Sequence, residues 1–405
     1  MKKRVLCMLM AGILLLPSAS ACEKKNESAE KQENTEELSE TKDEKEGTDA
    51  AEASVTDTDD KDSKGSEQNN SENSSGITIS LPENTESDID YTSAEGLVLP
   101  AGTRIAVIAK STKTPYFKAV KEGMKLAIED LNKAAGLSGK NAITMTFEAP
   151  SNSNDAEGQI NIGDAVLSEN PDALCLSAID VASFGAQLEA AAENGIPVTI
   201  FDSSIAAVDG ADYDYTICQT DNYAAGAKAA SKMAALMKGS GSVLIVADEK
   251  NTESIENRIS GFKKRLKKKH SGITVKEVMY GDDDEDTRDL AERIKEELDE
   301  NPDITGIFAT NEIAAEDVLD VLENYEGNRP AFIGFDTGSK QIQAVRDGLE
   351  DGFIGQNPYG MGYATIISVA RSILGKDNDA VIDPGYHWID ISNFDKEKNQ
   401  MYLYE

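Results

Sequence analysis

Short apolar runs alternate with longer amphipathic runs from about residue 103 onward. Several of the short runs are continuously hydrophobic, which is typical of strands covered on both faces. The longer runs have helical spacing, as in Phe117, Val120, Met124, Ile128 and Leu131. This alternation predicts an α/β fold in which helices cover a mostly parallel, doubly wound sheet.

The expected strands are too many for one sheet of this kind, so we predict two such lobes. A fixed short repeat is not found along the chain. The expected strands are residues 105–109, 143–147, 173–176, 197–201, 215–218, 242–247, 273–280, 304–310, 331–335, 352–355 and 386–391.

The beginning of the chain is typical of an export signal. Basic residues are followed by a short apolar core and by small residues up to Ala21, so residues 1–21 are predicted to be a signal peptide. The residues Ala19, Ser20, Ala21 and Cys22 also resemble a bacterial lipobox, although the usual Leu is Ala19 here. We expect Cys22 to be lipidated and to anchor the protein to the membrane. Ordinary signal cleavage before Cys22 remains the alternative.

An acidic segment follows Cys22. Residues 23–97 contain 23 acidic and 7 basic residues and almost no aromatic residues. Such a segment cannot bury enough apolar surface to offset its ordering entropy, so residues 22–97 are predicted to be a lipid-attachment Cys with a disordered tether. The formal net charge of −34 argues against nucleic acid as a partner, because phosphate binding needs clustered Lys and Arg.

Polar side chains follow five of the expected strands, where ligands of open parallel sheets bind. Hydroxyl-rich ligands need such hydrogen-bonding groups together with aromatic faces, and the helix after one further strand contains Arg258. Any one of the Asp or Asn residues could instead be only a helix N-cap, and either aromatic residue could belong to the core. The candidates are Lys110, Asp202, Asn311, Asp336 and Gln356, with Arg258, Tyr116 and Phe117.

At these residues the chain resembles the type I periplasmic binding proteins, and the ribose-binding branch in particular. The resemblance covers about residues 103–391 and depends on the order and spacing of seven segments. These are IAVIAKSTKTPYF (105–117), GIPVTIFD (195–202), TDNYAAG (220–226), RISGF (258–262), IFATN (307–311), IGFD (333–336) and GQNPYGMG (355–362).

The resemblance implies that Asp202, Arg258, Asn311, Asp336 and Gln356 form hydrogen bonds to a sugar and that Tyr116 and Phe117 sandwich its ring. The chain departs from the ribose branch at four positions, which puts ribose itself in doubt. A different monosaccharide, a sugar alcohol or an amino sugar would each fit. The departures are Lys110, Thr114, Ser203 and Glu285, and the first three are included among the predicted ligand-binding residues.

The implied fold has two lobes joined by three crossings, near residues 220–221, 356–357 and 386–391. The N-terminal lobe is expected to contain residues 98–220 with 357–385. The C-terminal lobe is expected to contain residues 221–356 with 386–405. We expect an extracytoplasmic, monomeric lipoprotein of a Gram-positive type surface, which captures a small polar ligand, most plausibly a monosaccharide, and delivers it to an ABC permease.

Two alternatives use the same fold differently. The protein could hand its liganded form to a receptor kinase, or it could be a glycoside hydrolase with Asp202 and Asp336 as paired carboxylates. The second alternative is remote, because nothing in the sequence separates the two pKa values. We therefore expect no enzymatic activity and no cofactor.

Metal sites and catalytic motifs find little support in the sequence. The acidic run at residues 282–286 lacks the Gly and the distant Glu of a calcium loop. Phosphate-loop and nucleophile-elbow motifs are not found, and the two His residues, His270 and His387, do not suggest a metal site or a catalytic dyad. Cys175 and Cys218 are expected to be buried thiols, with a disulfide as the alternative.

Overall fold

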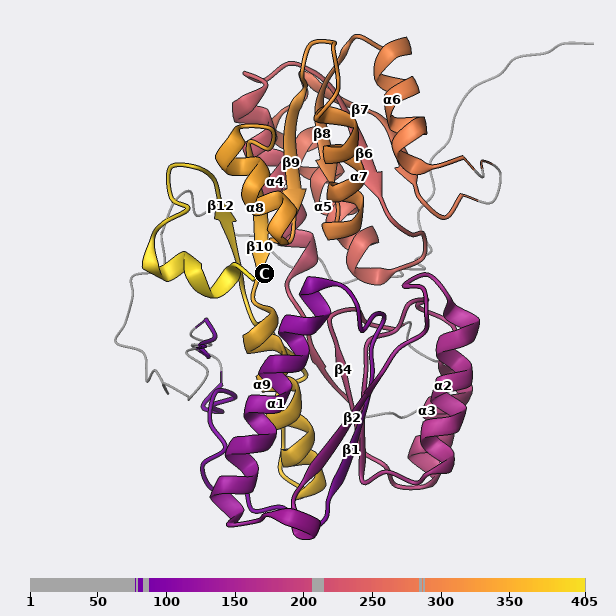
Figure 1. Ribbon diagram of the computed structural model, residues 1–405, viewed down its shortest axis with the longest axis vertical. Helices are drawn as coiled ribbons and strands as arrows, with labels where there is room; N and C mark the ends of the chain where they lie inside the picture. The colour runs from indigo at the N-terminus through magenta and orange to yellow at the C-terminus, as the bar shows by residue number, and fades with distance from the viewer. Residues whose placement is uncertain are drawn as a thin grey trace, which may run out of the picture. The chain divides into compact units, whose positions relative to one another are not determined.

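A computed structural model describes residues 77, 79–82, 87–205, 215–283, 286 and 288–404. The predicted signal peptide, Cys22, most of the predicted tether and Glu285 lie outside the described residues. The described chain forms two α/β lobes, each built on a six-stranded sheet (Figure 1). This confirms the fold class that the alternating pattern predicted.

The sheet of the first lobe has the order β11-β5-β4-β3-β1-β2, and all its strands are parallel. Four side chains of β3 are completely buried, as expected of a strand that is covered on both faces. The strands are β1 Arg104–Ile108, β2 Thr144–Glu148, β3 Ala173–Leu176, β4 Val198–Phe201, β5 Thr216–Cys218 and β11 Val381–Ile382.

Helices cover both faces of this sheet. Helices α1 and α9 lie side by side on one face, and α2 and α3 lie on the other (Figure 1). Two apolar clusters separate these helices from the strands. The helices are α1 Pro115–Ala135, α2 Ala156–Ser168, α3 Gly185–Glu193 and α9 Pro358–Ile373, with a short 3₁₀ helix at Gly139–Asn141.

The second sheet has the order β12-β10-β9-β8-β6-β7. Only its edge strand β12 is antiparallel, because the chain reaches it through a link from the other lobe rather than through a helical crossover. The strands are β6 Gly241–Ala247, β7 Ile273–Tyr280, β8 Ile304–Ala309, β9 Ala331–Phe335, β10 Gly352–Gln356 and β12 Tyr386–Ile389.

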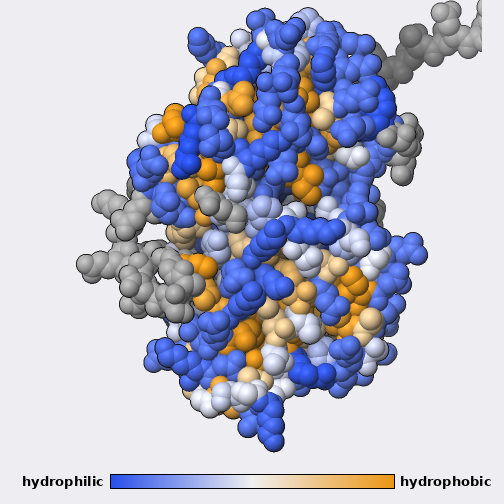
Figure 2. Space-filling view, viewed as in Figure 1, coloured by the Kyte–Doolittle hydropathy of each residue, from blue (hydrophilic) through white to orange (hydrophobic). Residues whose placement is uncertain are grey.

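Helices α4 and α5 cover one face of the second sheet, and α6 and α7 cover the other. Helix α8 packs near β10 and β12 in a smaller apolar cluster. The helices are α4 Asn222–Leu236, α5 Glu253–Lys269, α6 Leu290–Glu300, α7 Glu312–Leu322 and α8 Ser339–Asp347, with a 3₁₀ helix at Glu397–Tyr402. The visible face of both lobes is mostly hydrophilic (Figure 2).

Two boundaries differ from the sequence-based predictions. The packed part of the chain begins before residue 98, because Ile79, Tyr91 and Leu97 are at most 4% exposed and belong to the core of the first lobe. The third link between the sheets joins β11 to β12 and therefore lies at residues 383–385, just before the predicted 386–391. The two-residue strand β11 was not expected, since a pattern of that length carries no periodicity.

Candidate ligand-binding site

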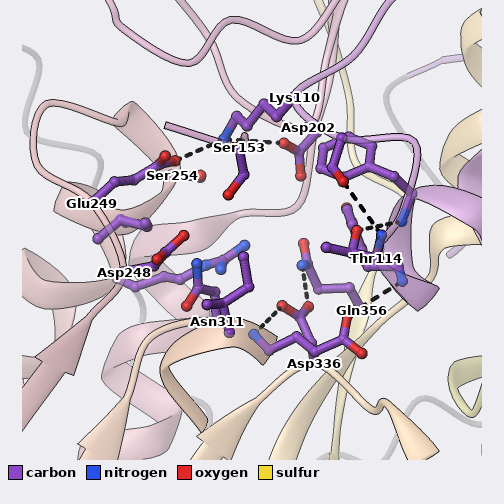
Figure 3. Close-up of a pocket in the computed structure, with 17 residues that line it drawn as sticks. Lys110, Thr114, Ser153, Asp202, Asp248, Glu249, Ser254, Asn311, Asp336 and Gln356 are labelled. Atoms are coloured by element: carbon purple, nitrogen blue, oxygen red, sulfur yellow. Dashed lines mark hydrogen bonds and ion pairs between the residues drawn. The ribbon is translucent and has the colours of Figure 1, made fainter. Parts of the chain in front are cut away.

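A cavity of about 60 Å³ lies at the carboxyl ends of the strands of both sheets, between the two lobes (Figure 3). Nine of the ten predicted ligand-binding residues line this cavity. They are Lys110, Thr114, Tyr116, Phe117, Asp202, Arg258, Asn311, Asp336 and Gln356. The rule that ligands bind beyond the carboxyl ends of parallel strands therefore located a real cavity.

Ser203 is the exception. It is completely buried and does not line the cavity. Its hydroxyl oxygen accepts a hydrogen bond from the backbone N–H of Ser254 at 3.4 Å, from the other lobe. Ser203 therefore makes a contact between the lobes, because the Asp202 side chain points towards the cavity whereas the Ser203 side chain points away from it.

Lys110 and Asp202 form the wall contributed by the first lobe. The Lys110 ammonium lies 3.3 Å from Asp202 Oδ2 and 3.8 Å from Glu249 Oε1 of the second lobe. The hydroxyl of Ser177 donates to Asp202 Oδ2 at 2.9 Å. Since both ion pairs are almost completely buried, they hold Lys110 across the gap between the lobes.

Tyr116 and Phe117 begin α1, where the hydroxyl oxygen of Thr114 accepts a hydrogen bond from the Phe117 backbone N–H. Their ring centroids lie 5.2 Å apart and their planes form an angle of 84°. Only one of two perpendicular rings can lie parallel to a ligand ring. The predicted sandwich between these two residues is therefore not the arrangement that the structure has.

Arg258 contributes a fixed cation from α5. Its Nε donates to Asn222 Oδ1 at 2.9 Å, and its Nη1 donates to the Thr310 carbonyl oxygen at 2.7 Å. The guanidinium also lies over the Phe335 ring, 3.7 Å from its centroid. These contacts determine the orientation of the guanidinium plane before any ligand arrives.

Asp336 and Gln356 belong to a hydrogen-bonded chain that reaches the link between the lobes. Thr220 donates through its hydroxyl to Gln356 Oε1 at 2.9 Å, and Gln356 Nε2 donates to Asp336 Oδ1 at 2.6 Å. The backbone N–H of Glu312 donates to Asp336 Oδ2 at 3.0 Å. Burial raises the pKa of Asp336, whereas Arg258 opposes that rise.

Asn311 caps a helix and also lies at the cavity. Its Oδ1 accepts a hydrogen bond from the Ala314 backbone N–H at 3.0 Å, which caps α7. The residue also lines the cavity. Its amide NH₂ group makes no hydrogen bond within the described part of the chain, so it is available to a ligand.

Sequence reasoning missed several residues of the cavity. Asp248 and Glu249 follow β6 directly, so the same strand-end rule could have identified them. Glu312 and Ile313 begin α7 beside Asn311, and no local pattern distinguishes them from ordinary helix residues. The missed residues are Ser111, Ser153, Asp248, Glu249, Ser254, Ile255, Glu312 and Ile313.

Three of the missed carboxylates have raised pKa values. Burial raises the pKa of Asp248 to about 7, and the neighbouring Glu249 adds to the rise. Burial, helped by the negative charge of Asp336, raises the pKa of Glu312 to about 8. Burial also raises the pKa of Glu249, although Lys110 opposes that effect. The cavity is thus lined by carboxyl groups that hold their protons more strongly than they would in water.

The acidic run after β7 is held by cations of the protein. Both carboxylate oxygens of Asp282 accept from the Lys250 backbone N–H, and Asp283 pairs with the Lys250 ammonium at 3.2 Å. Arg293 lies 3.4 Å from Asp286. Within the described residues, no group of acidic, His or Cys side chains is arranged to hold a metal ion.

The cysteines of the first sheet are buried and free. Cys175 and Cys218 form no disulfide with each other, because their strands β3 and β5 are separated by β4. Burial raises the pKa of both thiols. His387 stacks on Tyr402, with ring centroids 5.7 Å apart.

Comparison with known proteins agrees with this arrangement. Residues 105–377 match the Periplasmic binding protein domain family, so the chain belongs to that family, and within it to the type I proteins of sugar importers. No curated protein sequence matches the chain. Among the described residues, none of the helices is both long and apolar enough to cross a membrane.

Solved structures of high similarity are sugar-binding proteins. A carbohydrate transporter solute-binding protein from Agrobacterium radiobacter, in complex with D-arabinose, is 26% identical with a TM-score of 0.65. An ABC transporter solute-binding protein from Agrobacterium vitis, bound with α-D-tagatopyranose, is 25% identical with a TM-score of 0.66. Each alignment covers 75% of this chain and 99% of the other.

The periplasmic component of an ABC-type sugar transport system from Hahella chejuensis is 26% identical, with a TM-score of 0.62. That alignment covers 71% of this chain and 99% of the other. These relatives are binding proteins of transporters and not enzymes, and this chain is likewise a binding protein. The glycoside hydrolase alternative is thereby set aside.

Proposed function

We propose that the chain captures a small, hydroxyl-rich ligand of the size of a monosaccharide by closure of its two lobes. The single observation that supports this most strongly is the cavity, where both lobes contribute hydrogen-bonding side chains at the carboxyl ends of their sheets. A ligand that bonds to Asp202 on one side and to Asn311 on the other would bind the closed arrangement better than an open one.

Contacts across the cleft support closure as part of binding. The hydroxyl of Thr252 donates to the Ile179 carbonyl oxygen at 2.7 Å, and the Val181 backbone N–H donates to the Asn251 carbonyl oxygen at 3.3 Å. The backbone N–H of Ser204 donates to Glu253 at 3.3 Å. Thr252 and Ser204 are buried and belong to neither apolar core, so a hinge motion could break these hydrogen bonds without disturbing either core.

We further propose that the closed protein delivers its ligand to an ABC permease. We also propose that a lipidated Cys22 anchors the protein to the outer face of the cell membrane. The export signal and the lipobox-like residues support the anchor, and the relatives' roles in transporters support the permease. A monomer is proposed because exposed large hydrophobic residues are few among those described. They are Val98, Leu236, Val381 and Ile391.

Binding of sugars to the purified full-length protein tests this function. Thermal unfolding would be followed with D-arabinose, D-tagatose, D-glucose and D-galactose, and with amino acids and nucleosides for contrast. A ligand at a hundred times its dissociation constant should stabilise the protein by about 2.7 kcal/mol. A stabilising amino acid or nucleoside, with no stabilising sugar, would contradict the proposal.

Asn311→Ala tests the site itself. We expect this variant to lose at least about tenfold in affinity, because it removes the amide that faces the ligand. Asn324→Ala is the matched control, since Asn324 is exposed beyond the end of α7. Comparing the ligand-induced shift of each variant with its own ligand-free state removes the effect of the lost helix cap. Equal ligand-induced shifts in the two variants would place the site elsewhere.

A further inference from the structure

The cavity contains more negative than positive groups. Among the described residues, the cationic side chains that line it are Lys110 and Arg258. Five carboxylates line it, which gives an excess of acidic side chains even after each cation is assigned a partner. These are Asp202, Asp248, Glu249, Glu312 and Asp336.

The five carboxylates differ in how well they are partnered. Asp202 and Asp336 have close partners on their oxygens. Glu249 and Glu312 are each 4% exposed, and one buried carboxylate oxygen of each has no hydrogen-bond partner in the described structure. Asp248 forms no hydrogen bond or ion pair with any described residue, and its carboxylate points into the cavity (Figure 3).

The surroundings of Asp248 do not supply the missing positive charge. The charged groups that act most strongly on it are Glu249 beside it, Asp282 after β7, Asp317 on α7 and Lys110 after β1. Three of these are negative, and Lys110 is already shared between Asp202 and Glu249. The end of the cavity formed by Asp248 and Glu249 is therefore the more negative one.

Glu312 lies in a similar field at the opposite end. Asp336 and Glu316 add negative charge there, and Lys118 on α1 is the opposing cation. The Tyr116 backbone N–H donates to Glu312 Oε2 at 3.3 Å. Glu312 therefore has one partial partner, whereas Asp248 has none among the described residues.

We propose that the ligand is cationic, a polyol or sugar with an ammonium group, and that the ammonium binds at Asp248 and Glu249. An ammonium has three donors and no acceptor, so it matches carboxylate oxygens that lack donors. Ser153 and Ser254 lie beside these carboxylates and would complete the acceptor set (Figure 3). The hydroxyls of the ligand would then face Asn311 and Asp336. This inference rests on the proposed binding of a small hydroxyl-rich ligand.

A neutral sugar would leave this end of the cavity without compensation. Closure around it would remove water from Asp248 and Glu249 without supplying a positive charge, which is unfavourable for buried carboxylates. A cation instead favours their ionised forms. Binding of a cationic ligand should then release protons from the carboxyl groups of Asp248 and Glu249, whose pKa values are raised. The affinity for the cationic ligand should therefore increase from pH 6 to pH 7.

Calorimetry with matched pairs of ligands tests the inference on the full-length protein. The pairs are D-glucosamine with D-glucose and D-galactosamine with D-galactose, with the N-acetylated sugars as neutral controls. At pH 7 we expect at least one amino sugar to bind about tenfold more tightly than its neutral partner, as one charge-assisted contact allows. Titration in buffers of different ionisation enthalpy should detect proton release with the amino sugar only.

The ratio of the affinity for an amino sugar to the affinity for its neutral partner measures the preference for the ammonium group. Asp248→Asn should reduce this ratio at least about fivefold. Glu323→Gln at the far end of α7 removes the same charge from an exposed position and should leave the ratio unchanged. If Asp248→Asn does not fold, Glu249→Gln replaces it in the same comparison.

The outcomes separate the two proposals. Neutral sugars that bind as tightly as amino sugars, or a ratio that Asp248→Asn leaves unchanged, would overturn the cationic ligand and leave sugar binding intact. Absence of binding by every sugar and amino sugar would count against both proposals.

Discussion

Buried carboxylates without cations make the ligand-free cleft sensitive to pH. The raised pKa values of Asp248, about 7, and Glu312, about 8, mean that the folded protein holds protons that the unfolded chain has already lost. Where the folded state binds more protons, its stability decreases as the pH rises. The protonated form is thus the more stable form of the empty cleft.

We predict that the ligand-free protein is less stable at pH 8 than at pH 6, by about 1–3 kcal/mol. Urea unfolding at the two pH values measures the difference. The double variant Asp248→Asn with Glu312→Gln should show a smaller loss, because neither replacement titrates in this range. A wild-type stability that increases over the same interval would show that these carboxyls are ionised in the folded state.

The strand-end rule selected residues that line the cavity where a polar residue directly follows a strand, as for Asp202, Asn311 and Asp336. Ser203, which was included only because of the resemblance, does not line the cavity, because the chain turns at Asp202, whose positive φ no sequence pattern announces. The strand-end rule could not find Glu312, whose position depends on how α7 is placed.

At the scale of elements, both lobes use the same close packing of helices. Helices α1 and α9 approach through Gly123 and Gly362, where an added Cβ would lie 2.1 Å from the Tyr359 carbonyl oxygen and 2.0 Å from that of Val120. Helices α4 and α5 approach through Gly226 and Gly261 in the same way. The periodic pattern predicted these helices, yet the need for glycine at the crossings became clear only from the three-dimensional structure.

We predict that Gly226→Ala weakens both stability and ligand binding. Its Cβ would lie 2.0 Å from the Arg258 carbonyl oxygen, so α5 must shift and move the guanidinium that lines the cavity. The expected loss of stability is about 1–3 kcal/mol, and urea unfolding measures it. Calorimetry should show an affinity at least about fivefold lower, since Arg258 is held by directional hydrogen bonds.

Gly272→Ala is the control for this prediction. Its added Cβ would lie 2.4 Å from the Gly239 carbonyl oxygen, which is a comparable clash. Gly272 directly precedes β7, so this clash lies at the amino ends of the strands, away from the cleft. This variant should lose stability and keep its affinity. If both glycine variants bind equally well, the α4–α5 crossing does not control the position of Arg258.

At the scale of the whole molecule, the chain before residue 98 and the end of the chain both reach the links between the lobes. Asn357 donates to the carbonyl oxygen of Ser80 at 2.7 Å and to that of Pro384 at 3.0 Å. Tyr404 packs on Tyr116 and accepts a hydrogen bond from the Thr337 backbone N–H at 3.2 Å. Composition alone assigned residues 79–97 to the tether, because a few buried residues such as Ile79 and Tyr91 hardly change the average of an acidic segment.

Closure of the lobes is the motion on which the proposed function depends, and Thr252 provides a direct test of it. Its hydroxyl lies 2.7 Å from the Ile179 carbonyl oxygen across the cleft and 2.7 Å from Glu249 Oε1 within its own lobe. Thr252→Val removes both contacts, and only the contact with Ile179 depends on closed lobes. We predict an affinity about fivefold lower, which corresponds to about 1 kcal/mol for one hydrogen bond.

Thr365→Val is the matched control, because the Thr365 hydroxyl donates to the Met361 carbonyl oxygen within α9. Calorimetry gives both affinities, and small-angle scattering should show a larger ligand-free radius of gyration for Thr252→Val alone, since its closed form is less populated. Equal affinities in the two variants would mean that this contact between the lobes does not contribute to closure.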